Sequence, residues 1–310
     1  MTLPRLAASL LLALAAFAGV TQWRAAAREA AAEAAFPPTG QFVIVDGLRL
    51  HYEIAGTGPD LVMIHGASGS LRDMTFGLRD RLTDRYRVIV VDRPGLGHSD
   101  PLPQTSLRAQ ARAIRAGLAQ IGVSEPVVLG QSYGGAVALA WALEGGPRAL
   151  VLVGAATMPW PGELGPLYRL TTTRAGRAVL APLAAAWAPQ FAVDRFIAAV
   201  FAPAAVPPGY REGVGAALSL RRATLKANSA QINALRGELV TMAPLYPALR
   251  LPVELVHGSA DRIVPLAVHA GPLSRLLPNV RLTVIDGAGH MPHHSHPDAV
   301  IAAIDRAALR

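Results

Sequence analysis

Short apolar runs alternate along the chain with segments in which apolar residues recur at helical spacing. Residues 41–45 and 48–54 are predicted to be the two strands of a hairpin, because they are joined by Asp46-Gly47, a dipeptide typical of a tight hairpin turn. Helical patterns at 106–121 and after residue 132 separate apolar runs of strand length. These runs, each predicted to be a buried strand, are Leu61–Ile64, Tyr86–Val91, Pro126–Leu129, Ala149–Val153, Val253–His257 and Val280–Ile285. The alternation predicts an α/β fold, in which a mostly parallel sheet is covered by helices on both faces and reactive residues lie at the carboxyl ends of its strands.

The first apolar run differs from the others in its position and length. Residues 6–20 are nearly all Leu, Ala and Phe, and residues 21–23 extend the run to about the length that crosses a bilayer. We therefore expect residues 1–23 to be a retained signal anchor, with a cleaved signal peptide as the alternative. Residues 24–40 are expected to be a stalk and linker, helical over 24–35 and ending at 36–40, where Pro37-Pro38 breaks the helix.

The charges that flank this run do not orient it in a membrane. Arg5 precedes the run, and Arg24 and Arg28 follow it, so neither end is marked as the cytoplasmic one. We expect a membrane-associated protein whose remaining part lies in the periplasm, or a secreted or periplasmic protein if the segment is removed.

Composition excludes some kinds of chemistry. The 310 residues include no cysteine, so the chain has no disulfide framework, no thiol nucleophile and no thiolate metal ligand. With 52% hydrophobic and 16% charged residues, the chain suits one α/β core with an insertion. The fold therefore depends on packing alone.

The most specific chemical pattern follows the predicted strand at 126–129. Gly130-Gln131-Ser132-Tyr133-Gly134 places a serine between a strand and a helix, with glycine two residues away on each side. This is the pattern of a nucleophile elbow, in which the chain passes too close at the flanking positions to leave room for side chains. The turn also directs the backbone N–H of Tyr133 toward the position of an oxyanion. Ser132 is therefore the predicted nucleophile, and Gly130 and Gly134 are expected to have structural roles.

A serine nucleophile requires a base and a carboxylate that orients the base. Asp261 follows the predicted strand at 253–257, and His290 follows the predicted strand at 280–285. The order Ser132, Asp261, His290, with each residue in a loop after a strand, differs from the order in the serine triads of other folds. We expect these three residues to be catalytic.

Together these motifs resemble the α/β-hydrolase fold superfamily, in its branch of esterase-like and haloperoxidase-like enzymes. The resemblance covers residues 41–310 and includes two further segments, Leu61–Gly69 and Val88–Asp100. It implies that the backbone N–H of Ala67 is the second oxyanion donor, beside that of Tyr133. His65, Gly66 and His98 are expected to be structural residues near the site.

About ninety residues separate the strand that ends near Gly154 from the strand that begins at Val253. In the family, an insertion at this point is a helical cap over the serine. We therefore expect a core at 41–157 and 249–310, with a cap at 158–248 between the sixth and seventh strands. Large apolar residues of the cap are expected to line the substrate pocket or to pack the cap against the core. They are Trp160, Leu164, Leu167, Tyr168, Leu170, Trp187, Phe191, Phe196 and Phe201.

Most of the net charge of +8 falls in the predicted cap. Residues 158–250 contain ten basic and four acidic residues, but no nucleic-acid-binding motif accompanies them, and we expect no nucleic-acid partner. The excess is either a solvated, arginine-rich surface or, beside the anchor, a surface that faces anionic lipid headgroups.

Four histidines lie close together near the end of the chain, at positions 290, 293, 294 and 296. Such clusters can bind metal through neutral imidazoles, but cysteine is absent and no nearby pair of acidic residues completes a ligand set. We expect no metal and no cofactor. His290 is assigned to the triad, and His293, His294 and His296 to the beginning of the C-terminal helical region.

The resemblance and the three residues predict a serine hydrolase, a carboxylesterase that cleaves a small or lipid-like hydrophobic ester through an acyl-enzyme on Ser132. The serine argues against epoxide hydrolase or haloalkane dehalogenase activity, since those relatives form their alkyl-enzyme ester on an aspartate. A cofactor-free haloperoxidase or perhydrolase, a lactonase and a carbon–carbon bond hydrolase would use the same residues and are alternatives. Outside enzymes, the alternative is a catalytically silent, membrane-bound ligand-binding protein.

Overall fold

The computed structural model describes residues 3–309 except 163, 166–167 and 169. Its centre is an eight-stranded sheet with the strand order β1-β2-β4-β3-β5-β6-β7-β8. β1 is antiparallel to β2, β2 is antiparallel to β4, and all other neighbouring strands are parallel. The strands are β1 (Gln41–Val45), β2 (Leu48–Ala55), β3 (Asp60–Ile64), β4 (Arg87–Val91), β5 (Val127–Gln131), β6 (Ala149–Val153), β7 (Val253–Gly258) and β8 (Val280–Ile285). The predicted α/β fold is confirmed.

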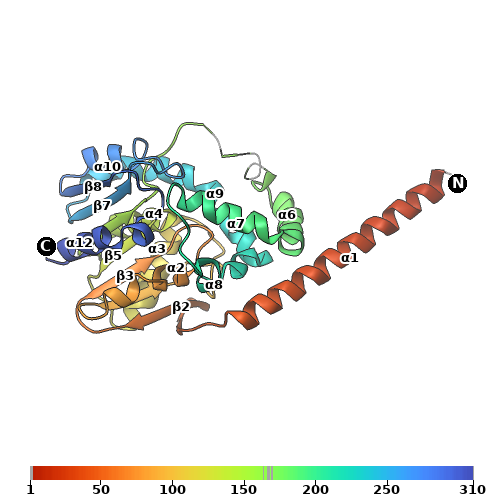
Figure 1. Cartoon of the computed structure of the whole chain (residues 1–310), viewed down its shortest axis with the longest axis horizontal. Coiled ribbons are helices and arrows are strands. Elements are labelled where there is room, and N and C mark those ends of the chain that lie inside the picture. Colours follow the sequence, from red (N-terminus) through yellow and green to blue (C-terminus); the bar gives the residue numbers. More distant parts are fainter. Residues whose placement is uncertain (1–2, 163, 166–167, 169, 310) are drawn as a thin grey trace.

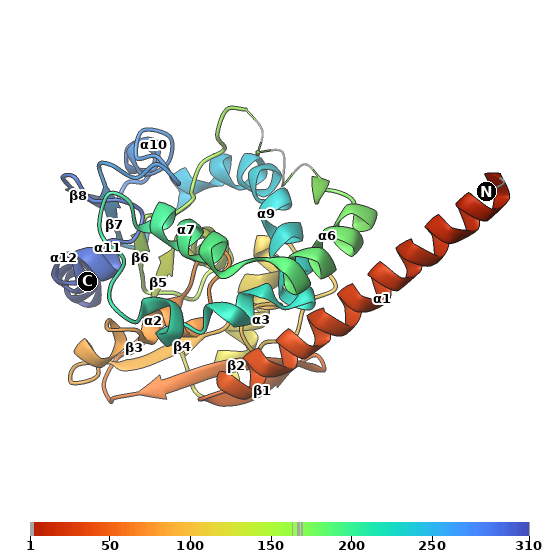
Figure 2. The same ribbon diagram turned by 45° about the vertical axis from the view of Figure 1, so that its right-hand side comes forward.

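Helices cover both faces of this sheet (Figures 1 and 2). Because successive residues of a strand face opposite sides, Val62 and Ile64 of β3 pack in one core with α3 and α4, whereas Leu61 and Met63 pack in the other core with α2 and α12. The helices outside the cap are α2 (Leu71–Thr75), α3 (Leu107–Gln120), α4 (Tyr133–Leu143), α10 (Ala270–Leu276), α11 (Pro292–Ser295) and α12 (Pro297–Ala308), with a 3-10 turn η1 (Arg79–Arg81).

The local sequence explains where these helices begin and which side they bury. The hydroxyl of Ser106 accepts a hydrogen bond from the Ala109 N–H and caps the N-terminus of α3. Leu107, Ile114 and Leu118, which lie on one face of α3, are fully buried against the sheet.

The insertion between β6 and β7 is helical, as the sequence predicts. Its elements are α6 (Arg174–Trp187), α7 (Gln190–Phe201), α8 (Tyr210–Gly213), η2 (Ala216–Leu220), α9 (Arg222–Met242) and η3 (Ala243–Ala248). α9 is the main link between the cap and the core, because Leu235, Leu239 and Met242 are buried in the same core as α3 and α4. The proposed boundaries of the cap, 158–248, stay a prediction.

The large apolar residues of the cap divide into buried and exposed ones. Phe201 is buried, and Trp160 is half-buried beside His269, with ring centroids 6.2 Å apart. In contrast, the four side chains at positions 170, 187, 191 and 196 are 42–72% exposed, so the expectation that they pack the cap or line a pocket is wrong. For Phe191 and Phe196 the reason is that α7 contacts the body through its C-terminal end: all residues of α7 are described, and Phe201 alone among them is buried. Leu167 lies outside the described residues.

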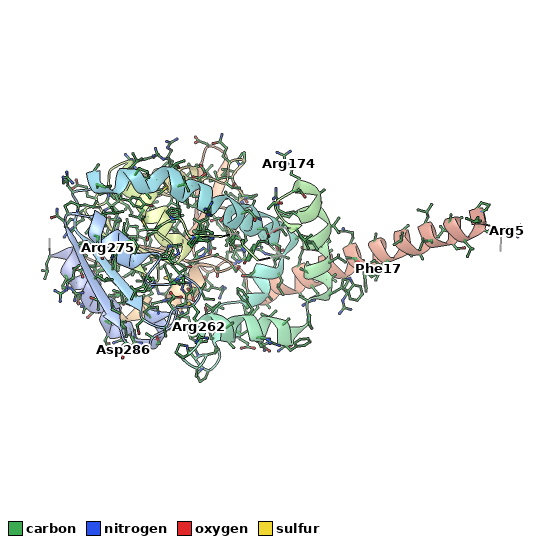
Figure 3. The ribbon with its side chains drawn as sticks, turned by 90° about the horizontal axis from the view of Figure 1, so that it is seen from above. Arg5, Phe17, Arg174, Arg262, Arg275 and Asp286 are labelled. Carbon is green, nitrogen blue, oxygen red and sulfur yellow. The ribbon has the colours of Figure 1, made fainter. Side chains whose placement is uncertain are left out.

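α1 (Leu3–Ala35) is one unbroken helix that projects from the body, with Arg5 near its far end (Figures 1 and 3). It is long and apolar enough to cross a membrane, as either an anchor or a signal sequence would be. Its second half does not stand free as a stalk, because Ala25 is fully buried against Ala185 and Ala186 of α6. The limits 1–23 and 24–40 therefore stay predictions, and the proposed boundary between residues 23 and 24 falls within the helix.

Candidate active site

Ser132 lies at the sharp turn between β5 and α4, as the motif predicts. Its backbone has φ 52° and ψ −118°, a conformation that a residue with a side chain rarely adopts. A Cβ atom on Gly130 would lie 2.4 Å from the Gly134 carbonyl oxygen, and one on Gly134 would lie 2.2 Å from the Ile64 carbonyl oxygen. Both glycines are thus required by close backbone contacts, and the turn presents the Ser132 hydroxyl above the carboxyl end of the sheet.

The structure brings Asp261 and His290 to this hydroxyl. His290 Nε2 is 3.0 Å from Ser132 Oγ, and His290 Nδ1 is 2.8 Å from Asp261 Oδ2. The aspartate follows β7 and the histidine follows β8, so adjacent parallel strands deliver both residues to the same edge of the sheet. The three predicted residues therefore form one hydrogen-bonded chain.

Asp261 is held as a carboxylate by its surroundings. Burial would raise the pKa of Asp261, but hydrogen bonds from His257 and His290 outweigh that effect and hold the pKa well below its usual range. Its Oδ1 atom accepts the N–H groups of Ile263 and Val264, both at 2.9 Å. An ionised Asp261 requires the proton of His290 on Nδ1, which leaves Nε2 as the acceptor for Ser132.

Two backbone N–H groups flank the serine and lack acceptors among the described residues. One belongs to Tyr133, the first residue of α4, and the other to Ala67, in the loop after β3. A Cβ atom on Gly66 would lie 2.3 Å from Gln131 Oε1 and 3.0 Å from Ser132 Cβ, so the chain before Ala67 passes directly beside the nucleophile. This arrangement suits an oxyanion hole.

The cap helix α9 holds the loop that carries Ala67. Asn228 Oδ1 accepts the Ser68 N–H at 2.9 Å, and Asn228 Nδ2 donates to Ser68 Oγ at 2.8 Å. Ser219 Oγ donates to the Ser68 carbonyl oxygen at 2.6 Å. These contacts restrain Ser68, whose φ of 57° is unusual for serine. No sequence motif marks Asn228 or Ser219, because their role depends on how the cap approaches the core.

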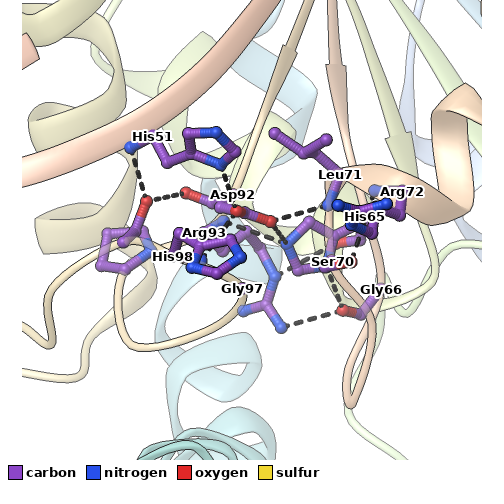
Figure 4. A network of polar contacts seen from close by, with 12 residues as sticks. His51, His65, Gly66, Ser70, Leu71, Arg72, Asp92, Arg93, Gly97 and His98 are labelled. Atoms are coloured by element: carbon purple, nitrogen blue, oxygen red, sulfur yellow. Dashed lines mark hydrogen bonds and ion pairs between the residues drawn. The ribbon is translucent and has the colours of Figure 1, made fainter. Parts of the chain in front are cut away.

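Arg93 is a fully buried cation behind this loop (Figure 4). It donates to the carbonyl oxygens of His65 and Gly66, each at 3.0 Å, and to the side-chain oxygens of Gln110 and Gln231. Burial lowers the pKa of Arg93 to about 10, so it stays charged at neutral pH. Since Gln231 belongs to α9, Arg93 is a second connection between the cap and the loop.

His65 and His98 lie near the site in a structural network around Asp92 (Figure 4). His65 is fully buried, with Nδ1 2.8 Å from the Gly66 carbonyl oxygen and Nε2 accepting the Arg93 N–H at 3.0 Å. Asp92 accepts the N–H groups of Leu71 and His98, and its Oδ2 atom is 2.7 Å from His51 Nδ1. Neither His65 nor His98 contacts Ser132, Asp261 or His290 through a described hydrogen bond.

The remaining histidines of the C-terminal cluster lie apart from the nucleophile. His293 Nε2 and His294 Nε2 are 3.1 and 2.9 Å from the carboxylate of Asp73, which also accepts the Tyr210 hydroxyl at 2.6 Å. The potential ligand atoms of Asp73, His293 and His294 lie within 4.8 Å of one another, so these residues are a group among the described residues that could hold a metal ion. Both Nε2 atoms hydrogen-bond to Asp73, whereas His293 Nδ1 is buried without a partner among the described residues. His296 is exposed beside Ser295. No sequence motif marks Asp73, because it is far from the histidines along the chain.

Comparison with known proteins identifies the family to which this chain belongs. Residues 61–303 match the alpha/beta hydrolase family, and the chain belongs to that family. It is 30% identical over 287 residues to an uncharacterized protein of Mycobacterium tuberculosis, a match that covers 87% of this chain and 81% of that protein. The expected membership of the α/β-hydrolase superfamily is confirmed.

Solved structures of hydrolases have the same fold as this chain. A thermophilic esterase from Thermogutta terrifontis superimposes with a TM-score of 0.69 at 26% identity, covering 86% of this chain and 96% of that one. A membrane phospholipase A, described as a bacterial virulence factor, has a TM-score of 0.66 at 24% identity and covers 98% of this chain and 99% of its own. At 24% identity, the likeness to the membrane phospholipase A shows the fold alone. The part of this chain that it covers extends into α1.

Proposed function

We propose that this α/β-hydrolase is a carboxylic ester hydrolase that acts through an acyl-enzyme on Ser132. The hydrogen-bonded chain from Ser132 through His290 to Asp261 carries this proposal. The esterase among its structural neighbours supports the same reaction class.

The proposed mechanism follows from the positions of these atoms. His290 Nε2 takes the proton of Ser132 as Oγ attacks the ester carbonyl carbon, and Asp261 stabilises the resulting imidazolium. The N–H groups of Ala67 and Tyr133 bind the negative oxygen of the tetrahedral intermediate. When the intermediate collapses, His290 returns the proton to the leaving alcohol, and the acyl group remains on Ser132.

Deacylation uses the same groups in the same positions. His290 Nε2 removes a proton from a water molecule, whose oxygen attacks the acyl carbon. The carbon–oxygen bond to Ser132 then breaks, the serine takes the proton back from His290, and the carboxylic acid leaves.

For the substrate, we propose a small or lipid-like hydrophobic ester that the enzyme meets at a membrane. The length and apolar character of α1 support attachment to a bilayer. The fold match to the membrane phospholipase A extends into α1, so that solved structure has the same fold together with a counterpart of part of this helix.

The first test is hydrolysis of p-nitrophenyl esters of increasing acyl length by the full-length protein, compared with the Ser132→Ala variant. Activity that disappears in Ser132→Ala but persists in Ser274→Ala, a matched change of a serine on α10, would support the proposal. Labelling by a fluorophosphonate should likewise require Ser132. The preferred acyl length would then indicate the size of the acyl pocket.

Other results would redirect the assignment. Halogenation that depends on peroxide and a carboxylic acid, without ester hydrolysis, would indicate a perhydrolase. Cleavage of a carbon–carbon bond or a lactone would move the substrate to those classes. A folded protein that neither hydrolyses esters nor reacts with the fluorophosphonate would be a ligand-binding protein.

A further inference from the structure

α1 consists of two halves with different surroundings. Residues 3–20 are exposed and, apart from Arg5 and Ser9, apolar, whereas Thr21 and Ala25 are buried at the contact with the cap. Polar contacts fasten this second half to α6 and α9. Arg24 and Arg28 donate to the carbonyl oxygens of Ala186 and Ala188 at the end of α6, and Glu29 pairs with Arg222 at 2.7 Å. The projecting half is therefore held at a fixed angle to the cap.

The length of the projecting half determines how close the cap comes to a membrane. At 1.5 Å per residue, residues 3–20 extend about 27 Å, close to the roughly 30 Å hydrocarbon core of a bilayer. The segment is no longer than the hydrocarbon core is thick, so Phe17 lies inside or at the edge of the hydrocarbon when α1 crosses the membrane.

Trp187, at the end of α6, contacts that same segment. Its ring is stacked on Phe17 with centroids 6.0 Å apart, and its Nε1 donates to Thr21 Oγ1 at 3.1 Å. The Arg24 guanidinium lies over the Trp187 ring, 4.8 Å from its centroid. A cap residue is thus packed on the helix at the level of Phe17. Tryptophan beside arginine is typical of the boundary between lipid and water.

Besides Trp187, α6 and α7 carry further exposed apolar side chains and two exposed cations. Val179 on α6 is 60% exposed, and Phe191, in the first turn of α7, is 72% exposed. Arg174 and Arg195 are exposed and have no ion-pair partner among the described residues. In Figures 1 and 2, α6 lies on the side of the body from which α1 projects, and Figure 3 shows Arg174 on that side. We name Arg174, Val179, Trp187, Phe191 and Arg195 the α6–α7 surface.

We propose that the α6–α7 surface rests on the bilayer that α1 crosses, with its apolar side chains at the acyl boundary and its arginines at anionic headgroups. This inference rests on the membrane attachment within the proposed function. It also explains why α7 is apolar yet exposed. The other end of α7 reaches the catalytic loop, because a Cβ atom on Gly289 would lie 2.1 Å from the Ala202 carbonyl oxygen. α7 therefore extends from the proposed bilayer contact to the loop of His290.

The absence of native cysteine allows a direct test with single labels on the full-length protein. Phe191→Cys and Val284→Cys would each carry an environment-sensitive fluorophore, in vesicles of neutral and anionic phospholipids with nitroxide-labelled acyl chains. Val284 is a matched control, because it is 45% exposed and lies on β8, at the end of the body away from α1. We expect severalfold stronger quenching at position 191 than at position 284. Equal quenching at both positions would overturn the proposal.

Two further measurements separate this inference from the catalytic proposal. Arg174→Gln with Arg195→Gln should reduce the quenching at position 191 more in anionic than in neutral vesicles; an equal effect in both would overturn the role of the arginines. Hydrolysis of a short, soluble ester by the same samples reports on the triad alone. Quenching without hydrolysis would support the bilayer contact and reject the esterase. The mass of the protein isolated from membranes shows whether residues 3–20 are retained, and their loss would overturn the bilayer contact.

Discussion

Asn228 and Ser68 are joined by two reciprocal hydrogen bonds, of 2.9 Å to the Ser68 N–H and 2.8 Å to its hydroxyl. They connect the cap helix α9 to the residue that follows Ala67. A proposed oxyanion donor therefore depends on a side chain from the cap, about 160 positions further along the chain. We therefore expect the position of the cap to affect the position of the Ala67 N–H group through this pair.

Replacing Asn228 tests this coupling. In Asn228→Ala the loop loses both bonds, and a displaced Ala67 N–H should lower kcat by about tenfold to a hundredfold, with a smaller change in KM for a short ester. Asn228→Asp keeps an acceptor for the Ser68 N–H and should recover part of kcat.

Asn233→Ala is the matched control for Asn228→Ala. Asn233 lies on the same helix but bonds to Thr171 and Ser229, away from the loop, so this variant should keep kcat. Equal kcat in Asn228→Ala and Asn233→Ala, measured on folded protein, would show that the cap does not position the loop.

Asp261→Asn should reduce kcat by about a thousandfold to ten thousandfold while the protein stays folded. The asparagine oxygen can still accept the N–H groups of Ile263 and Val264, so its amide nitrogen would face His290 Nδ1. His290 would then carry its proton on Nε2 and could not accept the proton of Ser132. Asp286→Asn, on the exposed loop after β8, is the control. An Asp261→Asn variant with near-normal kcat would reject Asp261 as the orienting residue.

Because three histidines are buried, we predict that the protein loses stability in mild acid. Burial lowers the pKa of His65, His269 and His293 to about 4, from an ordinary value of 6.5. The unfolded chain takes up these protons near pH 6.5, whereas the folded protein resists them until about pH 4. The stability that the neutral histidines contribute is therefore complete above pH 6.5 and is lost as the pH falls from about 6.5 to about 4.

Urea unfolding at a series of pH values checks this expectation. The free energy of unfolding should fall across that window, and His269→Gln should reduce the slope, because Nδ1 of His269 is near the N–H groups of Thr157 and Met158 at 3.2 Å and a neutral glutamine does not titrate. His296→Gln, at an exposed position, should leave the slope unchanged. A free energy that stays flat from pH 7 to pH 4 would contradict the prediction.

The parts of the fold and site that the sequence predicts are those with local signals. Strands buried on both faces are continuous apolar runs, so β3, β5 and β6 can be recognised from composition and length. Ser132 lies in a motif imposed by backbone contacts within a few residues, and Asp261 and His290 each follow a recognisable strand. Their approach to one another is then a consequence of strand order.

The parts that the sequence does not predict depend on contacts between distant segments. Nothing local distinguishes Asn228 from Asn233 on the same polar helix, yet only Asn228 reaches Ser68. Asp73 meets His293 across 220 positions. Phe191 has the composition of a packing residue, but its helix is docked at the opposite end, so its side chain is left exposed.

Two glycine-to-alanine changes, both within helices, separate backbone contact from helix propensity. In Gly134→Ala the new methyl group would lie 2.2 Å from the Ile64 carbonyl oxygen and 2.6 Å from that of His65, and these backbone atoms of the central strand and its loop cannot move aside. The free energy of unfolding should fall by about 3 kcal/mol. In Gly237→Ala, on α9, the methyl group meets nothing within 4 Å, so the better helix former should raise the free energy of unfolding by about 0.5–1 kcal/mol. Urea midpoints measure both effects. If Gly134→Ala were as stable as the parent protein, the elbow would not need the close backbone approach that places Ser132 beside Ala67.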